Sequence, residues 1–199
     1  MSQRASANEV RLIGGQWKRS KLQVLDKPGL RPTPNRVRET LFNWLGQDLS
    51  GWRCVDVFAG SGALGFEAAS RGALQVVLVE RDTALVRCLR DSQSRLKAAS
   101  VQVEAGDGLA YLQRCAQGSV DLVFLDPPFD ANVFDAALAA AAQVLADGGW
   151  AYLEADRAFT QAALQGAGWR LHRAGRAGAV FFHLLQRSLK QETPEASSH

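Results

Sequence analysis

The fold is decided by Arg53-Cys54-Val55-Asp56-Val57-Phe58-Ala59-Gly60-Ser61-Gly62-Ala63-Leu64-Gly65-Phe66-Glu67. Its first six residues form an apolar run that predicts a buried strand over 53–58. Gly60, Gly62 and Gly65 then follow the spacing G-x-G-x-x-G, between this strand and a helix expected over 62–71. Glycines in such a turn allow a tight backbone and the close approach of a ligand. The spacing alone is also typical of a nicotinamide-dependent oxidoreductase.

Outward from this stretch, apolar strands alternate with helical patterns. Strands are predicted at 53–58, 75–80, 101–104, 121–125, 150–154, 169–174 and 179–186, and helices at 62–71, 82–98, 108–116, 132–146 and 157–167. Such alternation predicts an α/β fold with a mostly parallel, seven-stranded sheet covered on both faces. Only Gly175 to Gly178 join the last two strands, so these should form an antiparallel C-terminal hairpin.

The N-terminal part of the chain is basic. Residues 1–40 hold nine Lys or Arg and three acids, a net charge of +6, so the rest carries −3 of the overall +3. We expect disorder over 1–9, then a small extension over 10–50 that contains a β-hairpin around Gly14-Gly15 and a helix from Pro34 to about Leu45, capped by Thr33. Arg36 and Arg38 should lie largely off its apolar face. The charge favours an arm that meets nucleic-acid phosphate over a merely solvated basic tail.

Three acids are expected at the ends of three successive strands. Asp56 would repel a dinucleotide's pyrophosphate but attract an ammonium or a sulfonium group. Glu80 can accept hydrogen bonds from both ribose hydroxyls, and Asp107 from an adenine amino group. The three together predict S-adenosylmethionine as the ligand. The alternative for Asp56 and Asp107 is that each caps a helix.

A fourth acid opens Asp126-Pro127-Pro128-Phe129, directly after the strand predicted at 121–125. Prolines restrict the backbone and remove N–H donors, so a carboxylate, a carbonyl and an aromatic ring are held close together. This set could grip a planar amine such as the exocyclic NH2 of a nucleobase. The alternative is an ordinary proline-stopped loop with a buried Phe.

These motifs resemble those of class I (Rossmann-like) S-adenosylmethionine-dependent methyltransferases. Asp56-x-Phe58-x-Gly60-x-Gly62 is similar to their first motif, and Asp126-Pro127-Pro128-Phe129 to the [DN]-P-P-[FYW] motif of enzymes that methylate amino groups. The segment from Leu30 to Leu45 resembles the N-terminal signature of the RsmD family, with Asn35 where Asp is expected, and Tyr152-Leu153-Glu154 also fits that family. The resemblance covers roughly residues 10–187.

The resemblance implies a methyltransferase domain over 51–187, followed by a flexible tail over 188–199. It implies methylation of guanine N2 in bacterial 16S rRNA, within a small-subunit particle that contains ribosomal proteins. The implied catalytic residues are Asp126, Pro127 and Phe129; the cofactor residues are Asp56, Phe58, Gly60, Gly62, Glu80, Arg81, Asp107, Gly108 and Asp126; the substrate residues are Arg31, Thr33, Arg36, Arg38, Pro128 and Phe129. The alternatives are adenine-N6 methylation of DNA or RNA, and an RNA-binding module without catalysis.

Length and composition indicate the size of the fold and the cellular compartment. The 199 residues suit one domain with a small appendage, 47% being hydrophobic and 22% charged. No run reaches membrane-spanning length and the N-terminus lacks a signal core, so we expect a cytoplasmic protein. The odd set of three Cys fits a reducing compartment, and three His without a Cys/His cluster predict no metal site. Nothing indicates an oligomer, so a monomer is expected.

Overall fold

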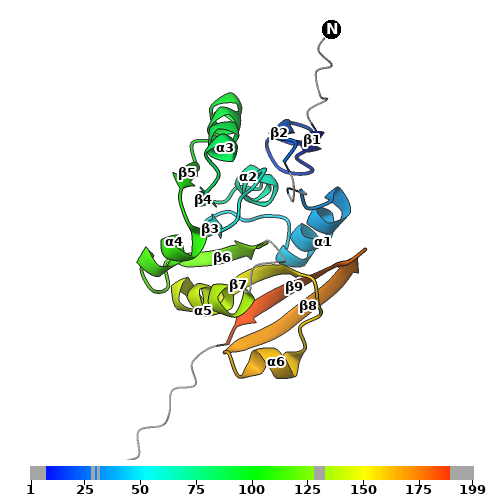
Figure 1. Ribbon diagram of the computed structural model, residues 1–199, viewed down its shortest axis with the longest axis vertical. Coiled ribbons are helices and arrows are strands. Elements are labelled where there is room, and N and C mark those ends of the chain that lie inside the picture. Colours follow the sequence, from blue (N-terminus) through cyan, green and yellow to red (C-terminus); the bar gives the residue numbers. More distant parts are fainter. Residues whose placement is uncertain (1–7, 28–29, 31, 128–132, 189–199) are drawn as a thin grey trace, which may run out of the picture.

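The computed structural model describes residues 8–27, 30, 32–127 and 133–188 and contains two sheets (Figure 1). The small one pairs β1 (Asn8–Arg11) with β2 (Lys21–Val24). The large one has the order β5-β4-β3-β6-β7-β9-β8. Its strands are β3 (Arg53–Asp56), β4 (Gln75–Glu80), β5 (Val101–Ala105), β6 (Val120–Leu125), β7 (Leu145–Ala155), β8 (Trp169–Ala177) and β9 (Val180–Arg187). The helices are α1 (Asn35–Leu45), α2 (Ala63–Ser70), α3 (Thr83–Leu96), α4 (Gly108–Arg114), α5 (Phe134–Val144) and α6 (Gln161–Gln165).

The pairing confirms the predicted fold. Strands β5, β4, β3, β6 and β7 are parallel neighbours, whereas β9 pairs antiparallel with both β7 and β8. Strand order reverses between β3 and β6, whose register joins Cys54 to Leu122 and Asp56 to Phe124. Open α/β sheets bind their ligands beyond the carboxyl ends of the strands at such a reversal.

Alternate strand residues supply two hydrophobic layers, because successive side chains of a strand point to opposite faces. One layer includes Cys54, Leu78 and Phe124 and is covered by α1, α2, α3 and the N-terminal hairpin. The other includes Val55 and Val123 and is covered by α4, α5 and α6. In Figure 1 these two groups of helices lie on opposite sides of the large sheet.

Several predicted boundaries shift. Strand β7 begins at Leu145, five residues earlier than predicted, because Leu145 pairs with Val120 of β6. The helix predicted at 157–167 shrinks to α6, where Thr160 caps the first turn. Asn8 and Glu9, which we expected to be disordered, pair with β2; the rest of that segment lies outside the described residues, as do residues 189–199.

Helix α1 differs from its prediction at both basic positions. Arg38 is fully buried, together with the apolar residues of the helix, whereas Arg36 is exposed. Thr33 does not cap the helix: Pro34 occupies the N-cap position, and the Thr33 hydroxyl donates to Glu154 Oε1 at 2.8 Å. A periodicity argument places charged residues outside, and it fails at Arg38 because this charge has internal partners.

Those partners centre on Glu67 of α2, which is also fully buried. Glu67 Oε2 accepts from Arg38 Nη1 at 3.2 Å and from the Ile13 amide at 2.9 Å, while Arg71 lies 3.0 Å from Oε1. Arg38 Nη2 also donates to the Arg11 carbonyl at 2.8 Å. This Glu67 cluster joins the hairpin and α1 to the large sheet's helical layer, so the extension is part of one packed structure.

Arg38→Ala should strongly destabilise the protein, because it removes one of Glu67's two cationic partners and leaves backbone carbonyls without a donor. We expect a loss of about 3–5 kcal/mol in the free energy of unfolding, measured by denaturant titration. Arg36→Ala, two residues earlier on the exposed side, is the matched control and should change stability by less than about 0.5 kcal/mol. Equal effects of the two substitutions would contradict this account of the Glu67 cluster.

Candidate functional site

Five acids meet at the carboxyl edge of the large sheet. Asp56, Glu80, Asp126 and Glu154 end or follow β3, β4, β6 and β7, and Asp107 follows β5 by two residues. Because these strands are parallel neighbours, the parallel pairing brings their carboxyl ends to the same edge. The structure therefore brings together the acids that the sequence predicted, and it adds Glu154 to them.

The glycines shape the loop between β3 and α2. Gly60 and Gly62 have φ of +52° and +75°, in the left-handed region that favours glycine. A Cβ on Gly65 would lie 2.1 Å from the Leu78 side chain, so this glycine lets α2 pack closely on the sheet. A Cβ on Gly108 would lie 2.2 Å from the Val57 carbonyl, which brings the start of α4 against the same loop. Such close packing of helix, loop and strand is expected of the glycine-rich loop in a nucleotide-binding fold.

Asp56 is the most enclosed acid of the set, with 2% of its surface exposed. Its Oδ2 accepts from the Gly65 amide at 3.1 Å, so it satisfies a donor of the first turn of α2 from the neighbouring strand. Burial raises the pKa of Asp56 to about 7, and the charges of Glu80 and Glu154 add to this, while the Gly65 amide opposes it. The helix-capping role and a ligand role are thus compatible in one residue.

Glu80 and Asp107 are held by backbone amides. Glu80 Oε2 accepts from Gly60 at 2.9 Å and Oε1 from Asp82 at 2.8 Å, which orients this half-buried carboxylate beside the glycine loop. Asp107 caps α4 by accepting from Ala110 at 2.8 Å, and its side chain is exposed. The capping alternative therefore describes Asp107 correctly, and a carboxylate retains further lone pairs for a ligand.

Asp126 and Pro127 stand where β6 ends, one partly exposed and the other buried. Burial raises the pKa of Asp126 well above its ordinary value, and the carboxylates of Glu154 and Asp56 raise it further. Of the other predicted site residues, Phe58 is half-buried and Arg81 is exposed. Arg31, Pro128 and Phe129 lie outside the described residues.

Glu154 is a buried acid of the site for which the sequence predicted no role, and it is only 5% exposed. Its Oε1 accepts from the hydroxyls of Thr33 and Tyr152, each at 2.8 Å. Burial raises the pKa of Glu154, against which both hydroxyls act. The available signal was Tyr152-Leu153-Glu154 itself, an alternation that places the Tyr and Glu side chains on one face next to β6.

A second group without a predicted role is Arg157, which follows β7. Its guanidinium lies over the rings of Phe134 and Phe159, with centroid distances of 5.2 and 5.1 Å. The side chain remains largely exposed, so a cation is held at this edge of the site by two aromatic faces. Arg157 lies three residues after Glu154, and its position directly after β7 is the sequence feature that could have indicated it.

The buried setting contradicts a surface role for Arg38, which was predicted to contact substrate, because its guanidinium is enclosed in the Glu67 cluster. Thr33 is likewise buried and faces Glu154 rather than solvent. Arg36 is exposed and keeps its predicted role as a hypothesis.

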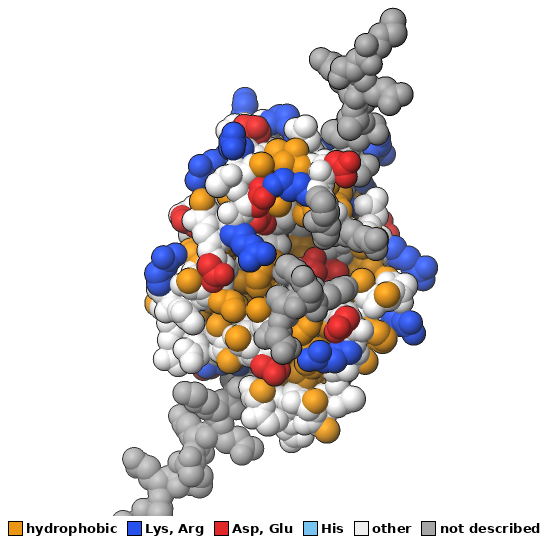
Figure 2. All heavy atoms as spheres, in the orientation of Figure 1, with side chains coloured by type: hydrophobic (Ala, Val, Ile, Leu, Met, Phe, Trp, Pro, Cys, Tyr) orange, Lys and Arg blue, Asp and Glu red, His pale blue; other side chains and the backbone are white. Residues whose placement is uncertain are grey.

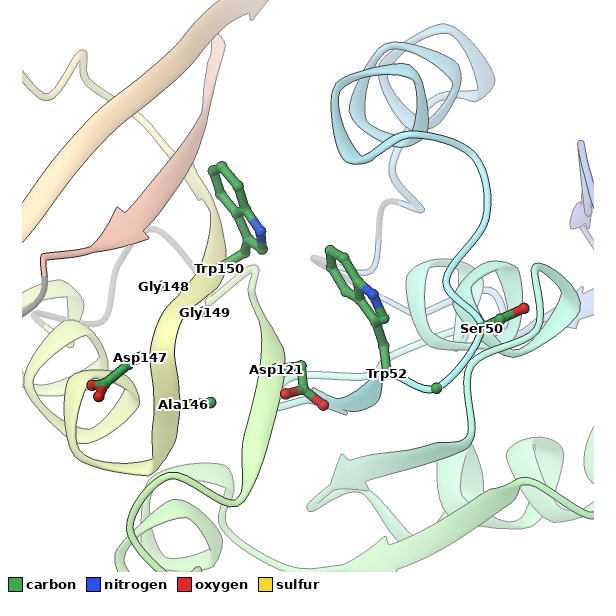
Figure 3. Close-up of a pocket in the computed structure, with 9 residues that line it drawn as sticks. Ser50, Trp52, Asp121, Ala146, Asp147, Gly148, Gly149 and Trp150 are labelled. Atoms are coloured by element: carbon green, nitrogen blue, oxygen red, sulfur yellow. The ribbon is translucent and has the colours of Figure 1, made fainter.

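A pocket of about 300 Å³ lies elsewhere, at the amino-terminal edge of β3 and β6 (Figure 3). Figure 3 shows the rings of Trp52 and Trp150 flanking it, with Asp121 below them. Asp121 is bound to Arg53, with its Oδ2 2.9 Å from Nε. Parallel strands carry their ligand sites at the opposite edge, so this pocket does not belong to the acidic site.

Asp56→Asn should stabilise the protein at neutral pH while keeping an acceptor for the Gly65 amide. The folded-state pKa of Asp56, about 7, exceeds its ordinary value of 3.8, so the stability present below pH 3.8 is lost as pH rises through 7. Thermal and denaturant unfolding should show a gain that is absent near pH 4 and reaches roughly 4 kcal/mol at pH 8.

Asp121→Asn serves as the control with the opposite sign, because the hydrogen bond from Arg53 lowers the pKa of Asp121. It should destabilise the protein at pH 8, and this loss should shrink as the pH falls below the ordinary pKa of 3.8. If the increase in the free energy of unfolding for Asp56→Asn does not depend on pH, the ionised carboxylate of Asp56 is not what destabilises the wild type.

Comparison with known proteins identifies the family to which this chain belongs. A family model described as "Conserved hypothetical protein 95" matches residues 10–186. "Ribosomal RNA small subunit methyltransferase D" of Escherichia coli K12 is 39% identical over 194 residues, covering 95% of this chain and 96% of the relative. The Haemophilus influenzae protein of the same name is 38% identical over 187 residues, covering 89% and 94%.

Solved structures also resemble this chain in their fold. The structure titled "Putative methyltransferase yhhF from Escherichia coli" has a TM-score of 0.79 and 39% identity, covering 92% of this chain and all of that one. More distant methyltransferases, such as a precorrin-6y C5,15-methyltransferase from Geobacter metallireducens at 17% identity and a TM-score of 0.64, share the fold. This chain therefore belongs to the RsmD family, whose matched relatives are named ribosomal RNA small-subunit methyltransferases.

Proposed function

We propose that this protein transfers a methyl group from S-adenosylmethionine to the exocyclic N2 of a guanine in bacterial 16S rRNA. The observation that carries the proposal is the position of Asp126, at the end of β6 beside β3 and its buried Asp56. A methyl donor bound over β3 and β4 would lie next to an amine held at β6. The two halves of the reaction would thus meet at the reversal of strand order.

The residues of the β3 and β4 ends fit this donor. When bound, S-adenosylmethionine supplies a methyl group activated by its sulfonium. Asp56 and its neighbours place negative charge where the cationic part would lie. Glu80, oriented by two amides, would accept from the ribose hydroxyls, and Asp107 from the adenine amino group.

Asp126 and Pro127 would hold the amine. The N2 lone pair of guanine is delocalised into the ring, so the enzyme gains most from orienting this nitrogen and stabilising positive charge as it develops there. The Asp126 carboxylate and the Pro127 carbonyl would each accept a hydrogen bond from one of the two N–H groups of N2. The raised pKa of Asp126 makes its ionised form a stronger acceptor for a proton that N2 must lose.

The substrate class rests on the relatives, whose names specify the ribosomal small subunit. The choice of guanine N2 rests on the resemblance of the 30–45 segment, because the Asp126-Pro127-Pro128-Phe129 motif fits an amino group of either guanine or adenine. The alternative is adenine N6, which presents the same amine to the same groups. In this proposal the enzyme acts as a monomer in the cytoplasm, on a small-subunit particle. No described helix is long and apolar enough to cross a membrane.

RNA phosphate would be met by separate basic side chains around the site. Figure 2 shows Lys and Arg side chains around the margin of the drawn face and also farther in, among acidic and hydrophobic ones. Arg36 on α1 and Arg157 after β7 are exposed on two elements that border the acidic edge. An arrangement of this kind would anchor the backbone while a base enters the acidic centre.

Asp126→Asn should abolish most turnover without removing the methyl donor's site. We expect the rate of methyl transfer to fall by about 10²–10⁴-fold, because the amide is a much weaker acceptor for N2. The measurement is label transfer from methyl-labelled S-adenosylmethionine to small-subunit particles, with the product nucleoside identified by mass spectrometry. Calorimetry with S-adenosylhomocysteine should show affinity retained within a few-fold.

Asp147→Asn, an exposed acid at the opposite edge of the sheet, is the matched control and should retain wild-type turnover. Unchanged methylation by Asp126→Asn would remove Asp126 from the mechanism. Recovery of N6-methyladenosine in place of N2-methylguanosine would select the adenine alternative.

Arg36→Ala should weaken binding to RNA and leave the affinity for S-adenosylhomocysteine unchanged. Losing one phosphate contact should lower the slope of log Kd against log salt by about one. Filter binding at several salt concentrations, with calorimetry for the cofactor product, separates the two. Arg170→Ala, an exposed cation on the edge strand β8, is the control. Equal loss of RNA and cofactor affinity in Arg36→Ala would contradict a phosphate contact.

A further inference from the structure

We propose that Glu154 is a positioning residue for methyl transfer, which connects the N-terminal extension to the amine-binding carboxylate of Asp126. This inference rests on the proposed function, and it assigns a role to a group that the reaction itself does not require. Four observations support it: the hydrogen bonds of Glu154, the course of the 30–34 segment, the strand that carries Glu154, and the charges around it.

The hydrogen bonds of Glu154 reach two different parts of the chain. Tyr152 lies on the same strand, but Thr33 is 121 residues away in the sequence, in the segment that leads into α1. All three side chains are buried, with at most 5% of their surface exposed. Two hydroxyl donors on one buried carboxylate oxygen hold it in one orientation, since few other partners can replace them there.

The segment around Thr33 also touches the glycine loop. Leu30 Cδ1 lies 3.0 Å from the position that a Cβ on Gly60 would occupy, so Leu30 packs on the loop that follows β3. Thr33, three residues later, meets Glu154 at the end of β7. Leu30 therefore lies beside the expected donor site, and Thr33 beside the expected amine site. The contacts that hold Leu30 and Thr33 in place are therefore contacts with the glycine loop and with Glu154.

Glu154 stands beside Asp126 because of the sheet register. β7 is the parallel neighbour of β6, and Leu125 pairs with Leu153, so Asp126 and Glu154 are the next residues of adjacent strands. Two carboxylates in this position disfavour each other's ionised form. Their protons then come off in steps that belong to the pair. Glu154 thereby adds to the effect of burial and moves to higher pH the range in which Asp126 can accept a hydrogen bond from N2.

The described surroundings of Asp126 and Glu154 contribute further acids and hydroxyls. The groups that face this pair are Asp56 of β3, Tyr152 of β7 and Thr33 of the link, with Glu80 of β4 facing Asp56. His183 of β9 is engaged elsewhere, with its ring nitrogens at the Leu153 carbonyl and the Phe159 amide. Glu154 raises the pKa of Asp126 more than Asp56 does. Of the two carboxylates, Glu154 is therefore the one whose removal should lower the pKa of Asp126 most.

Glu154→Gln separates a positioning role from a purely structural one. It retains an acceptor for Thr33 and Tyr152 but removes the charge. Methyl transfer should increase with pH as Asp126 ionises, and in Glu154→Gln this rise should move to lower pH, because Asp126 no longer faces a second carboxylate. A structural role would lower the rate equally at every pH. Asp147→Asn, on the same strand at its other end, should leave the profile in place.

The link to the extension is tested at Thr33. Thr33→Val keeps the shape and removes the hydroxyl, so turnover should fall roughly tenfold while affinity for S-adenosylhomocysteine stays within a few-fold. Thr33→Ser restores the hydroxyl and should recover most of the rate. Equal rates in the Val and Ser variants would overturn the connection between the extension and Glu154.

One measurement does not depend on turnover. In ligand-free protein, carbon-13 carboxyl NMR should show that Asp126 titrates at lower pH in Glu154→Gln than in the wild type. If the wild type methylates no ribosomal RNA, the proposed function fails while this titration still tests the coupling. If the wild type is active and neither the pH profile nor the titration moves, the inference about Glu154 is wrong and the proposed function stands.

Discussion

The parallel pairing of β3 with β6 is the constraint on which the rest of the structure depends. It places Asp56 and Asp126 at one edge of the sheet although 70 residues separate them in the sequence. The strands on either side extend this edge, with Glu80 on β4 and Glu154 on β7. Shortening or shifting this pairing by one residue would turn the two acids toward opposite faces, because strand side chains alternate.

Holding these acids together costs stability. Asp56, Asp126 and Glu154 all have raised pKa values, with burial as the first cause and neighbouring carboxylates as a second for Asp56 and Asp126. A chain selected for stability alone would place apolar residues or cations here. The same molecule shows the contrasting solution at Glu67, where two arginines surround a buried acid. The protein itself neutralises Glu67, whereas in the proposed function a cationic methyl donor lies beside Asp56 and Asp126.

The sequence was sufficient where the physics is local or periodic. Alternating strands and helices predicted a seven-stranded, mostly parallel sheet covered on both faces, and acids after strands predicted that Asp56, Glu80 and Asp126 are neighbours. It was insufficient for partners that are distant in the chain. Arg38 looked like a surface cation because its carboxylate, Glu67, lies 29 residues away, and Thr33 looked like a helix cap because its acceptor, Glu154, lies 121 residues away.

Both of those errors fall on the same segment, and this has a physical reason. Thr33, which precedes α1, and Arg38, which lies on α1, both place polar groups in the interior, where Thr33 meets Glu154 and Arg38 meets Glu67. A segment that only displayed charge to RNA would have no need of buried partners, and its residues could be exchanged freely for other basic ones. By fixing the link at two buried acids, the fold couples the extension to the helix that follows the glycine loop and to the strand beside Asp126. A substrate that engages the exposed side of α1 would therefore act on an element that is joined to Glu67 through Arg38 and to Glu154 through the preceding Thr33.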